Sequence, residues 1–220
     1  MVDEYLSERE QADQLKQWFK ENWLGLAAGI VLGLGGVFGY RWWISHQIAR
    51  SQEAEQQFSA MLDALVQERR EDGLQIAAGI IGDYADTPYA DQARLVLARL
   101  EIEAGNFETA AKSLSQVIDS TRDPELALLA RLRLARVQLA NGSHDEALAT
   151  LARVENPALA ARVAELRGDV MAASGKPADA LAAYREAQTA AGQGNSADGL
   201  VDQELLRLKI DELSVATAAE

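Results

Sequence analysis

The chain has 220 residues, of which 48% are hydrophobic but only 6% aromatic, and its formal net charge at pH 7 is −13. This charge argues against a nucleic-acid-binding protein, because phosphate contacts need a basic surface. The absence of cysteine excludes disulfides, thiol nucleophiles and cysteine-ligated metal centres. Abundant alanine and only four prolines favour an all-α fold.

The N-terminal part of the sequence has the pattern of a membrane anchor. Residues 1–21 are acid-rich and amphipathic, and we expect them to form a cytoplasmic tail. Residues 22–40, NWLGLAAGIVLGLGGVFGY, carry no charge, and as a helix they reach roughly 28 Å, about the thickness of the hydrocarbon layer. Aromatic residues stand at both ends of this stretch, as is typical of membrane interfaces. The sequence therefore predicts an uncleaved transmembrane helix over residues 22–44.

Charge and glycine spacing add two expectations for this helix. Basic residues are more numerous before the uncharged stretch of residues 22–40 than in the twenty residues after it, which favours a cytoplasmic N-terminus: Arg9, Lys16 and Lys20 precede the stretch, and Arg41 and Arg50 follow it. Glycine recurs every fourth residue at Gly25, Gly29 and Gly33, so these residues share a face that another helix can approach closely. The partner on that face is either a second copy of this chain or another membrane protein.

From residue 45 onward the chain is polar, rich in alanine and repetitive. Three segments align without gaps from Gly105, Gly142 and Gly175. In each, a small residue precedes the glycine by seven positions, alanine follows it by five, and a large residue follows it by nine. Stacked helical hairpins explain this pattern, since glycine turns the chain, small residues allow helices to cross and large residues fill the space between hairpins. A fainter copy is predicted from Gly73, and an irregular helical bundle is the alternative.

We expect residues 45–220 to form an all-α repeat domain. It begins with a long helix over residues 46–69 and continues with hairpin helices over residues 74–84, 88–104, 107–119, 124–141, 144–154, 157–174 and 177–191. Residues 192–199, GQGNSADG, are predicted to form a loop. A last helix over residues 200–213 is expected to cap the stack, and the tail after it is expected to fray.

Catalytic motifs are not recognisable in the sequence, and we expect neither an enzyme nor a bound cofactor. The stretch GLGG at residues 33–36 lies inside the apolar segment and lacks the lysine of a phosphate-binding loop. His144 stands beside Asp145 and Glu146 in a predicted turn, where a solvated histidine and a metal ligand are the two interpretations.

A binding surface is the more promising feature of the repeat domain, because the first helix of each hairpin lines the concave face of such stacks. A stripe on these helices mixes aliphatic side chains with arginines, and it comprises Gln92, Leu95, Arg99 and Ile102, then Leu132, Arg136 and Leu139 in the next hairpin. Arg162, Glu165 and Asp169 match these positions in the third hairpin. We predict that the stripe takes a polypeptide segment, and ordinary solvated arginine is the alternative.

The repeats and the order of parts resemble known families. The glycine, alanine and large positions resemble the tetratricopeptide repeat, although arginine, glutamate and glutamine stand where that repeat usually has Trp and Tyr. The whole chain resembles the YfgM family, the ancillary subunit of the bacterial SecYEG translocon. The stretches that carry this resemblance are DQLKQWFKEN at 13–22, GYRWWISHQ at 39–47, LRLARVQLA at 132–140, AELRGDVMAASG at 164–175 and LRLKIDELS at 206–214.

The resemblance implies a single-pass protein of the bacterial inner membrane, with its N-terminus in the cytoplasm and its repeat domain in the periplasm. It implies association with the SecYEG translocon and with PpiD, a membrane-anchored periplasmic chaperone. It also implies a role in passing emerging secretory proteins to periplasmic folding factors. A second hypothesis is a scaffold for another envelope complex, which forms homo-oligomers through Gly25, Gly29 and Gly33.

Overall fold

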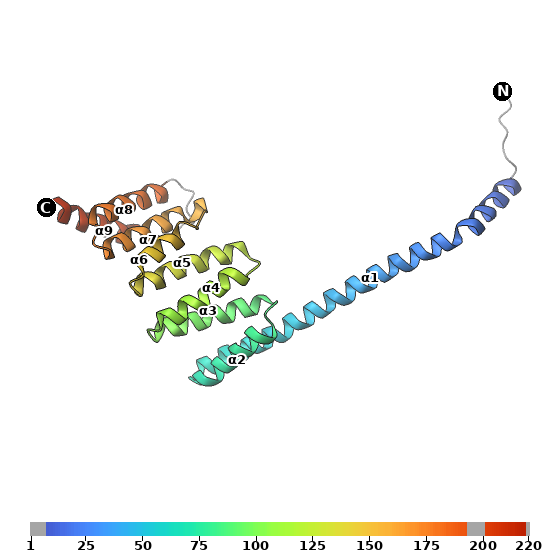
Figure 1. Cartoon of the computed structure of the whole chain (residues 1–220), viewed down its shortest axis with the longest axis horizontal. Coiled ribbons are helices and arrows are strands. Elements are labelled where there is room, and N and C mark those ends of the chain that lie inside the picture. Colours follow the sequence, from blue (N-terminus) through green and yellow to red (C-terminus); the bar gives the residue numbers. More distant parts are fainter. Residues whose placement is uncertain (1–7, 193–200, 219–220) are drawn as a thin grey trace, which may run out of the picture. The chain divides into compact units, whose positions relative to one another are not determined.

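The computed structural model describes residues 8–192 and 201–218, and all regular elements in these two ranges are helical, which confirms the all-α prediction (Figure 1). The elements are α1 (Glu8–Val66), α2 (Arg70–Asp83), α3 (Pro88–Glu103), α4 (Phe107–Ser120), α5 (Pro124–Ala140), α6 (His144–Leu151), the 3₁₀ turn η1 (Pro157–Leu159), α7 (Ala160–Ala173), α8 (Pro177–Gly192) and α9 (Gln203–Ala218). They belong to two compact units, which divide between Glu53 and Ala54.

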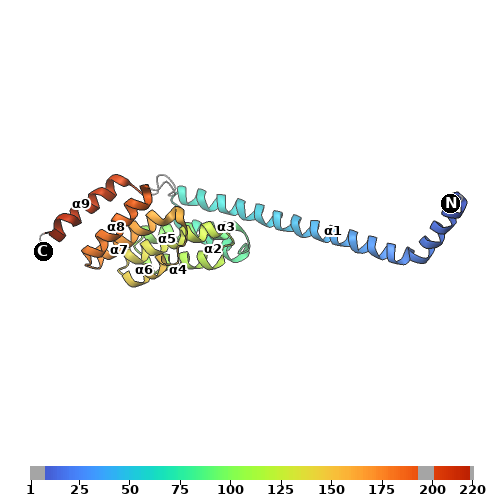
Figure 2. The same cartoon turned by 90° about the horizontal axis from the view of Figure 1, so that it is seen from above.

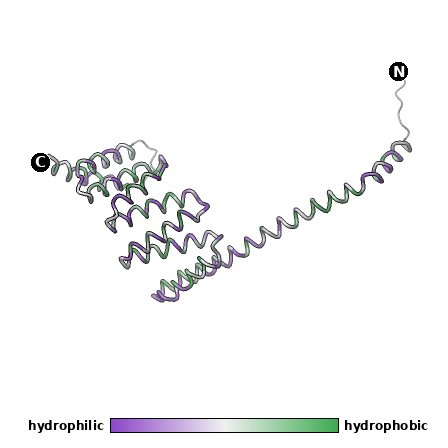
Figure 3. Tube along the Cα trace, in the orientation of Figure 1, coloured by the Kyte–Doolittle hydropathy of each residue, from purple (hydrophilic) through white to green (hydrophobic). Residues whose placement is uncertain are grey.

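The first unit is the N-terminal part of α1, a helix that continues without a break from Glu8 to Val66. Among the described residues, α1 is the one helix that is long and apolar enough to cross a membrane, with a mean hydropathy of 1.7 in its most apolar window. Figure 3 shows this apolar stretch in green along the middle of α1. Its large side chains are exposed, and Leu32 retains 76% of its accessible surface. Exposure of so much apolar surface to water is unfavourable, so this part of α1 requires an apolar environment such as lipid or another protein.

The second unit is a stack of helices in chain order (Figures 1 and 2). The extensive contacts join helices that follow one another in the sequence, from α2 and α3 to α8 and α9, and α5 also touches α7. The C-terminal part of α1 starts this stack, because Met61 is fully buried in one cluster with Ala77, Ile80 and Ala93. The predicted stack of helical hairpins is therefore confirmed.

The three predicted glycine turns are confirmed. Gly105, Gly142 and Gly175 all have positive φ angles, between 73° and 77°. In the first turn, the amide of Asn106 donates to the carbonyl oxygen of Glu101 at 2.8 Å, and the two other turns repeat this bond at 2.8 and 3.0 Å. Such bonds close a Schellman motif, in which a left-handed residue ends the helix, and glycine adopts that conformation without steric cost.

The alanine and large positions of the repeat form the core, as predicted. Ala110, Ala147 and Ala180 are fully buried, and the large residues four positions later are 1–3% exposed. Leu114 lies in one cluster with Ala98 of its own hairpin and Val137 of the next, so it joins successive hairpins. Small residues on crossing helices let the backbones approach, and a few large side chains fill the remaining space.

Two predictions about the repeats are wrong. The fainter copy from Gly73 does not exist as a turn, because Gly73 lies inside α2 and packs against Leu65. The turn before α2 is instead made around Glu68, which has a φ of 60°. The last helix begins at Gln203 and runs to Ala218, so residues 214–218 continue the helix rather than fray.

Helix α9 lies beside α8 at the C-terminal end of the stack in both views (Figures 1 and 2). Its Leu206 is 1% exposed and packs with Ala164, Ala180 and Tyr184. This contact agrees with the predicted capping position. The predicted loop over residues 192–199 lies outside the described residues, except for Gly192, which ends α8.

Candidate partner-binding groove

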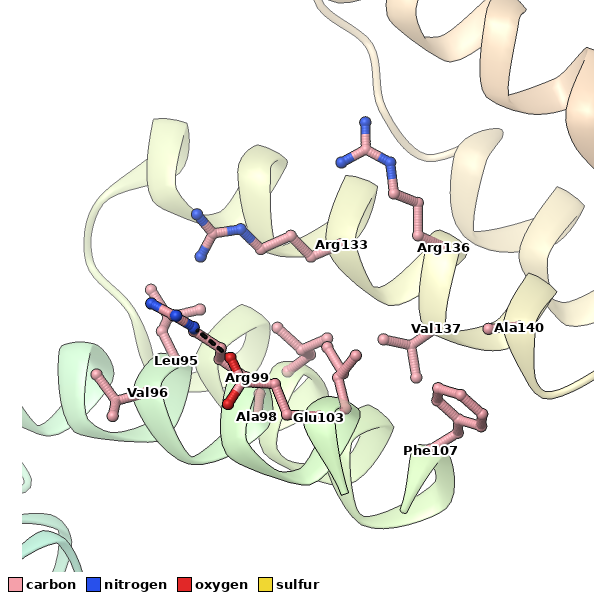
Figure 4. A pocket seen from close by; sticks show the side chains of 12 residues that line it. Leu95, Val96, Ala98, Arg99, Glu103, Phe107, Arg133, Arg136, Val137 and Ala140 are labelled. Carbon is pink, nitrogen blue, oxygen red and sulfur yellow. Dashed lines mark hydrogen bonds and ion pairs between the residues drawn. The ribbon is translucent and has the colours of Figure 1, made fainter. Parts of the chain in front are cut away.

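A groove opens between α3 and α5, the first helices of two successive hairpins (Figure 4). Its volume is about 570 Å³. We call it the α3–α5 groove, and its lining comprises Leu95, Val96, Ala98, Arg99, Ile102, Glu103, Phe107, Leu114, Arg133, Arg136, Val137 and Ala140. Most of these side chains are apolar, and the charged ones come from the solvent-facing positions of α3 and α5.

The floor of the α3–α5 groove is continuous with the core. Leu114 and Val137 are 1% and 3% exposed, and both belong to the cluster that joins the two hairpins. Phe107 stands at the first position of α4 and packs against the same cluster. Because the floor is held by this cluster, its shape is fixed by the packing of the repeats themselves.

The rim of the α3–α5 groove carries three arginines and one glutamate. The Arg99 Nε donates to Glu103 Oε1 at 2.8 Å, within α3, and both side chains are mostly exposed. Arg133 and Arg136 are exposed on α5, and neither pairs with an acidic side chain of the described residues. In Figure 4, Arg133 extends over the groove toward Leu95 and Arg99, whereas the Arg136 guanidinium points away from α3.

The structure brings four of the seven stripe residues into this groove: Leu95, Arg99, Ile102 and Arg136. Gln92 lies in a different hollow, beside the loops that precede α3 and α5. Leu132 is 5% exposed in a core cluster that includes Leu151, and Leu139 packs against that cluster. The use of this stripe by a partner stays a prediction.

Sequence reasoning missed Arg133, Phe107 and Val137. The signal for part of this set was present, because Arg133, Val137 and Ala140 are spaced by four and three residues along α5 and share one helix face. Phe107 is the first residue of α4, after the turn at Gly105. The residue spacing within α3 and α5, from which the stripe was predicted, therefore gives no information about it.

The third hairpin carries a polar cluster at the matching positions. The ammonium group of Lys209 on α9 donates to Asp169 Oδ1 at 2.6 Å and to Glu165 Oε1 at 3.2 Å. The Tyr184 hydroxyl donates to the same Asp169 oxygen at 2.8 Å, and Arg162 pairs with Glu165. These contacts fix α9 against α7. Burial and the hydrogen bond to Asp169 raise the pKa of the Tyr184 hydroxyl far above its usual value.

The glycines of the apolar segment face open space. A Cβ added to Gly25, Gly29 or Gly33 would meet no atom within 4 Å. Gly25 and Gly29 border a hollow of about 470 Å³ on α1, and Gly33 does not line it. This face is accessible to a second helix, and its use in helix packing stays a prediction.

Metal binding was one of the two interpretations that the sequence left open for His144. No three His, Cys, Asp or Glu groups in the part of the chain whose side chains are described cluster closely enough to hold an ion. His144 is half-buried at the start of α6, in a hollow that Asp145, Glu146 and Lys176 also line. A lysine in that hollow adds positive charge where a metal ion would have to bind.

Comparisons with known proteins agree with this architecture. A family model described as a tetratricopeptide repeat-like domain matches residues 16–215. A protein of Escherichia coli (strain K12) named "Ancillary SecYEG translocon subunit" is 33% identical over 211 residues, covering 96% of this chain and 98% of its own. A protein of Haemophilus influenzae with the same name is 30% identical over 208 residues, covering 94% and 98%.

A solved structure titled "MamA RS-1 ArsTM double mutant" has a TM-score of 0.51 at 16% sequence identity. It matches 76% of this chain and 97% of its own length, which supports the fold alone. The proteins of Escherichia coli and Haemophilus influenzae match this chain along nearly their whole length, across both the apolar helix and the repeats. The chain therefore belongs to the tetratricopeptide repeat-like family that includes the ancillary SecYEG translocon subunits.

Proposed function

We propose that this protein is a membrane-anchored interaction protein that associates with the SecYEG translocon. The observation that carries the proposal is the similarity to two ancillary translocon subunits over 98% of their length, anchor and repeats together. In this proposal the apolar part of α1 spans the inner membrane of a Gram-negative cell. The N-terminus lies in the cytoplasm and the repeat domain in the periplasm.

The repeat domain is proposed to act after secretory proteins leave the translocon. The α3–α5 groove combines an apolar floor with exposed arginines, and such a surface suits a polypeptide segment. A domain held beside the translocon raises the local concentration of its binding site for emerging chains. We propose that it passes these chains to periplasmic chaperones, PpiD among them, and that it carries out no chemical reaction itself.

The glycine face of α1 is proposed to contact a translocon helix. A helix in lipid gains little from burying apolar side chains, so close backbone approach at small residues becomes a main source of affinity. Gly25, Gly29 and Gly33 leave room for such an approach. The same room favours the alternative function, in which two copies pair through this face and form a scaffold for another envelope complex.

Photo-crosslinking in membranes of the native host separates these two functions. A photo-reactive residue at Gly29 is expected to give adducts with translocon subunits, and one at Arg99 adducts with a periplasmic chaperone or secretory chains. Val31 is the matched control for Gly29, because it is exposed on the other side of the same helix. If Gly29 gives only self-adducts, or if Arg99 captures cytoplasmic proteins, the proposal is wrong.

A further inference from the structure

The α3–α5 groove leaves apolar side chains in contact with water. Ile102 is 38% exposed, and Leu95, Val96 and Phe107 are half-buried around the same cavity of about 570 Å³. Sites for small ligands in proteins range from roughly 300 to 1,000 Å³, so this volume accepts several side chains of a partner. Apolar side chains of a partner would gain free energy by covering this floor.

The charge of the groove is opposite in sign to that of the whole chain. The chain has a net charge of −13, yet its ionisable groove residues are three arginines and one glutamate. Glu103 is paired with Arg99 at 2.8 Å. Arg133 and Arg136 therefore remain as positive groups to which the described part of the chain supplies no acidic partner.

The spacing of these two arginines points to a negative ligand group. Arg133 and Arg136 are three residues apart on α5, where like charges repel each other. A bound carboxylate relieves that repulsion, and a guanidinium can hold it through two parallel hydrogen bonds. Figure 4 shows Arg133 extending over the apolar side chains of α3. A ligand that reaches the floor can therefore place an acidic group beside Arg133.

We propose that the α3–α5 groove binds a polypeptide segment in which apolar side chains are flanked by Asp or Glu. The inference rests on the proposed function, in which the groove takes a polypeptide, and it adds the chemistry of that polypeptide. Apolar side chains enter the floor between Ile102 and Val137, and carboxylates contact Arg133 and Arg136. The same arginines repel basic segments, so the groove selects its partners by charge.

A second copy of the chain is the competing occupant. Helix α9 exposes Leu205, Leu208 and Val215 on its outer side, together with the acidic residues Glu204 and Asp211. This outer side has the chemistry that the groove accepts. A contact from the α9 of one copy to the groove of another would produce oligomers whose population grows with protein concentration.

Binding of two probe peptides to the full-length protein in detergent micelles tests the proposal. Both are fluorescent decapeptides with blocked ends and the same Leu and Ile residues, and one carries three glutamates where the other carries three lysines. The blocked C-terminus ensures that side-chain carboxylates, not a terminal one, are measured. We expect the unmodified protein to bind the glutamate peptide at least tenfold more tightly than the lysine peptide.

Charge reversal in the groove is the decisive variant. In R133E/R136E the preference is expected to reverse, because the rim changes sign while the apolar floor is kept. A protein that failed to fold would lose both peptides and would not exchange one for the other. R153E/R185E is the matched control, since it makes the same charge change at two exposed arginines outside the groove, and it is expected to keep the original preference.

Equal affinity of the unmodified protein for the two peptides, or an unchanged preference in R133E/R136E, overturns the inference. So does assembly that grows with concentration, is abolished by Leu208→Glu and blocks both peptides. Copurification of translocon subunits with the unmodified protein from native membranes keeps the two proposals apart. Copurified subunits without a peptide preference overturn only the groove chemistry. A glutamate preference that reverses in R133E/R136E, without copurified translocon subunits, overturns only the proposed function.

Discussion

The ring of Tyr184 on α8 occupies the space beside Gly168 in which any other residue would place its side chain. A Cβ added to Gly168 would lie 2.4 Å from both Cδ1 and Cε1 of Tyr184, far inside van der Waals contact. In the two preceding hairpins the corresponding pairs are Ala98 with Leu114 and Ala135 with Leu151. The third hairpin has thus exchanged a methyl group on one helix for an aromatic ring on the other.

Gly168→Ala is expected to lower the free energy of unfolding by about 1–3 kcal/mol, because the added methyl group overpacks the α7–α8 contact. The measurement is urea unfolding of the full chain in micelles, followed by circular dichroism. Gly79→Ala is the control, since a Cβ there meets no atom within 4 Å and the gain in helix propensity stabilises by up to about 1 kcal/mol. Equal shifts of the same sign in both variants would contradict the close contact.

Lys209→Met is expected to destabilise the attachment of α9. The variant keeps an apolar stem but removes the charge that neutralises Glu165 and Asp169, and the Glu165 side chain is only 4% exposed. We expect a loss of about 1.5–3 kcal/mol in unfolding free energy, in the range for hydrogen bonds to charged groups. The rate of amide hydrogen exchange in α9 should increase more than the rate in the other helices.

Lys112→Met is the matched control for that experiment. Lys112 pairs with Glu108 on the exposed side of α4, and both side chains are more than 70% exposed. Pairs of this kind contribute at most about 1 kcal/mol, so the variant should unfold nearly as the unmodified protein does. A loss of unfolding free energy as large as that of Lys209→Met would mean that burial of an ion pair does not determine its contribution to stability.

Alkaline pH is expected to weaken the fold through Tyr184. Its pKa is raised in the folded protein above the ordinary value of 10.0, mainly by burial and then by the hydrogen bond to Asp169. Below pH 10 both states keep the proton and the stability contribution is complete. Above pH 10 the unfolded chain loses the proton first, so stability falls by about 1.4 kcal/mol per pH unit from this group.

Tyr184→Phe isolates that effect, because it keeps the ring beside Gly168 and removes only the hydroxyl group. The variant is expected to lose stability less steeply than the unmodified protein between pH 9 and 11, as measured by urea unfolding. The charged residues around the ring, which are Lys209, Asp169, Glu165 and Glu212, are the same in both proteins. Parallel pH profiles would show that Tyr184 keeps its proton equally well in the unfolded chain.

Gly142→Ala is expected to destabilise the repeat domain by about 1–2 kcal/mol, because Gly142 has a φ of 77°, in the left-handed region that disfavours a Cβ. Thermal unfolding of the full chain is the measurement. Gly82→Ala adds the same methyl group in open space at the end of α2, and it should leave the melting temperature unchanged or raise it. A larger loss in Gly82→Ala would overturn this explanation of the turn.

Single cysteines can report the orientation of the chain, which has no cysteine of its own. Ala12→Cys and Ala104→Cys introduce one thiol each at exposed positions on opposite sides of the apolar segment. With a membrane-impermeant maleimide on intact spheroplasts, we expect labelling at position 104, and labelling at position 12 only after permeabilisation. The reverse pattern would place the repeat domain in the cytoplasm.

Positions with a strict local requirement could be predicted from the sequence. A left-handed turn requires glycine at Gly105, and a close helix crossing requires a small residue at Ala110, so the residue type itself reports the structure. The same reasoning wrongly predicted a turn at Gly73. A glycine that packs against Leu65 inside a helix cannot be distinguished from a turn glycine by its residue type alone.

The residues that line the groove could not all be predicted, because the sequence of a single helix does not show which of its faces points toward the neighbouring helix. Leu132 and Arg133 are adjacent in the sequence, and the rotation of α5 about its own axis decides which of them faces α3. That rotation follows from the packing of Leu132 in one cluster with Leu151 of the same hairpin and Leu166 of the next. Spacing within α5 predicts a shared face, but only these tertiary contacts select the face that lines the groove.

In the repeat domain, helices that are adjacent in the sequence contact each other. This arrangement also determines in which order the domain can fold and how it can be truncated. The helices from α2 to α9 make most of their contacts with the helices next to them in the sequence, so no hairpin needs a distant segment before it can form. Folding can follow the order of synthesis, with α9 arriving last, when Lys209 finally reaches Glu165 and Asp169. Removal of α8 and α9 would therefore shorten the stack and leave in place the contacts that form the α3–α5 groove, including those of Leu132 with Leu151 and Leu166.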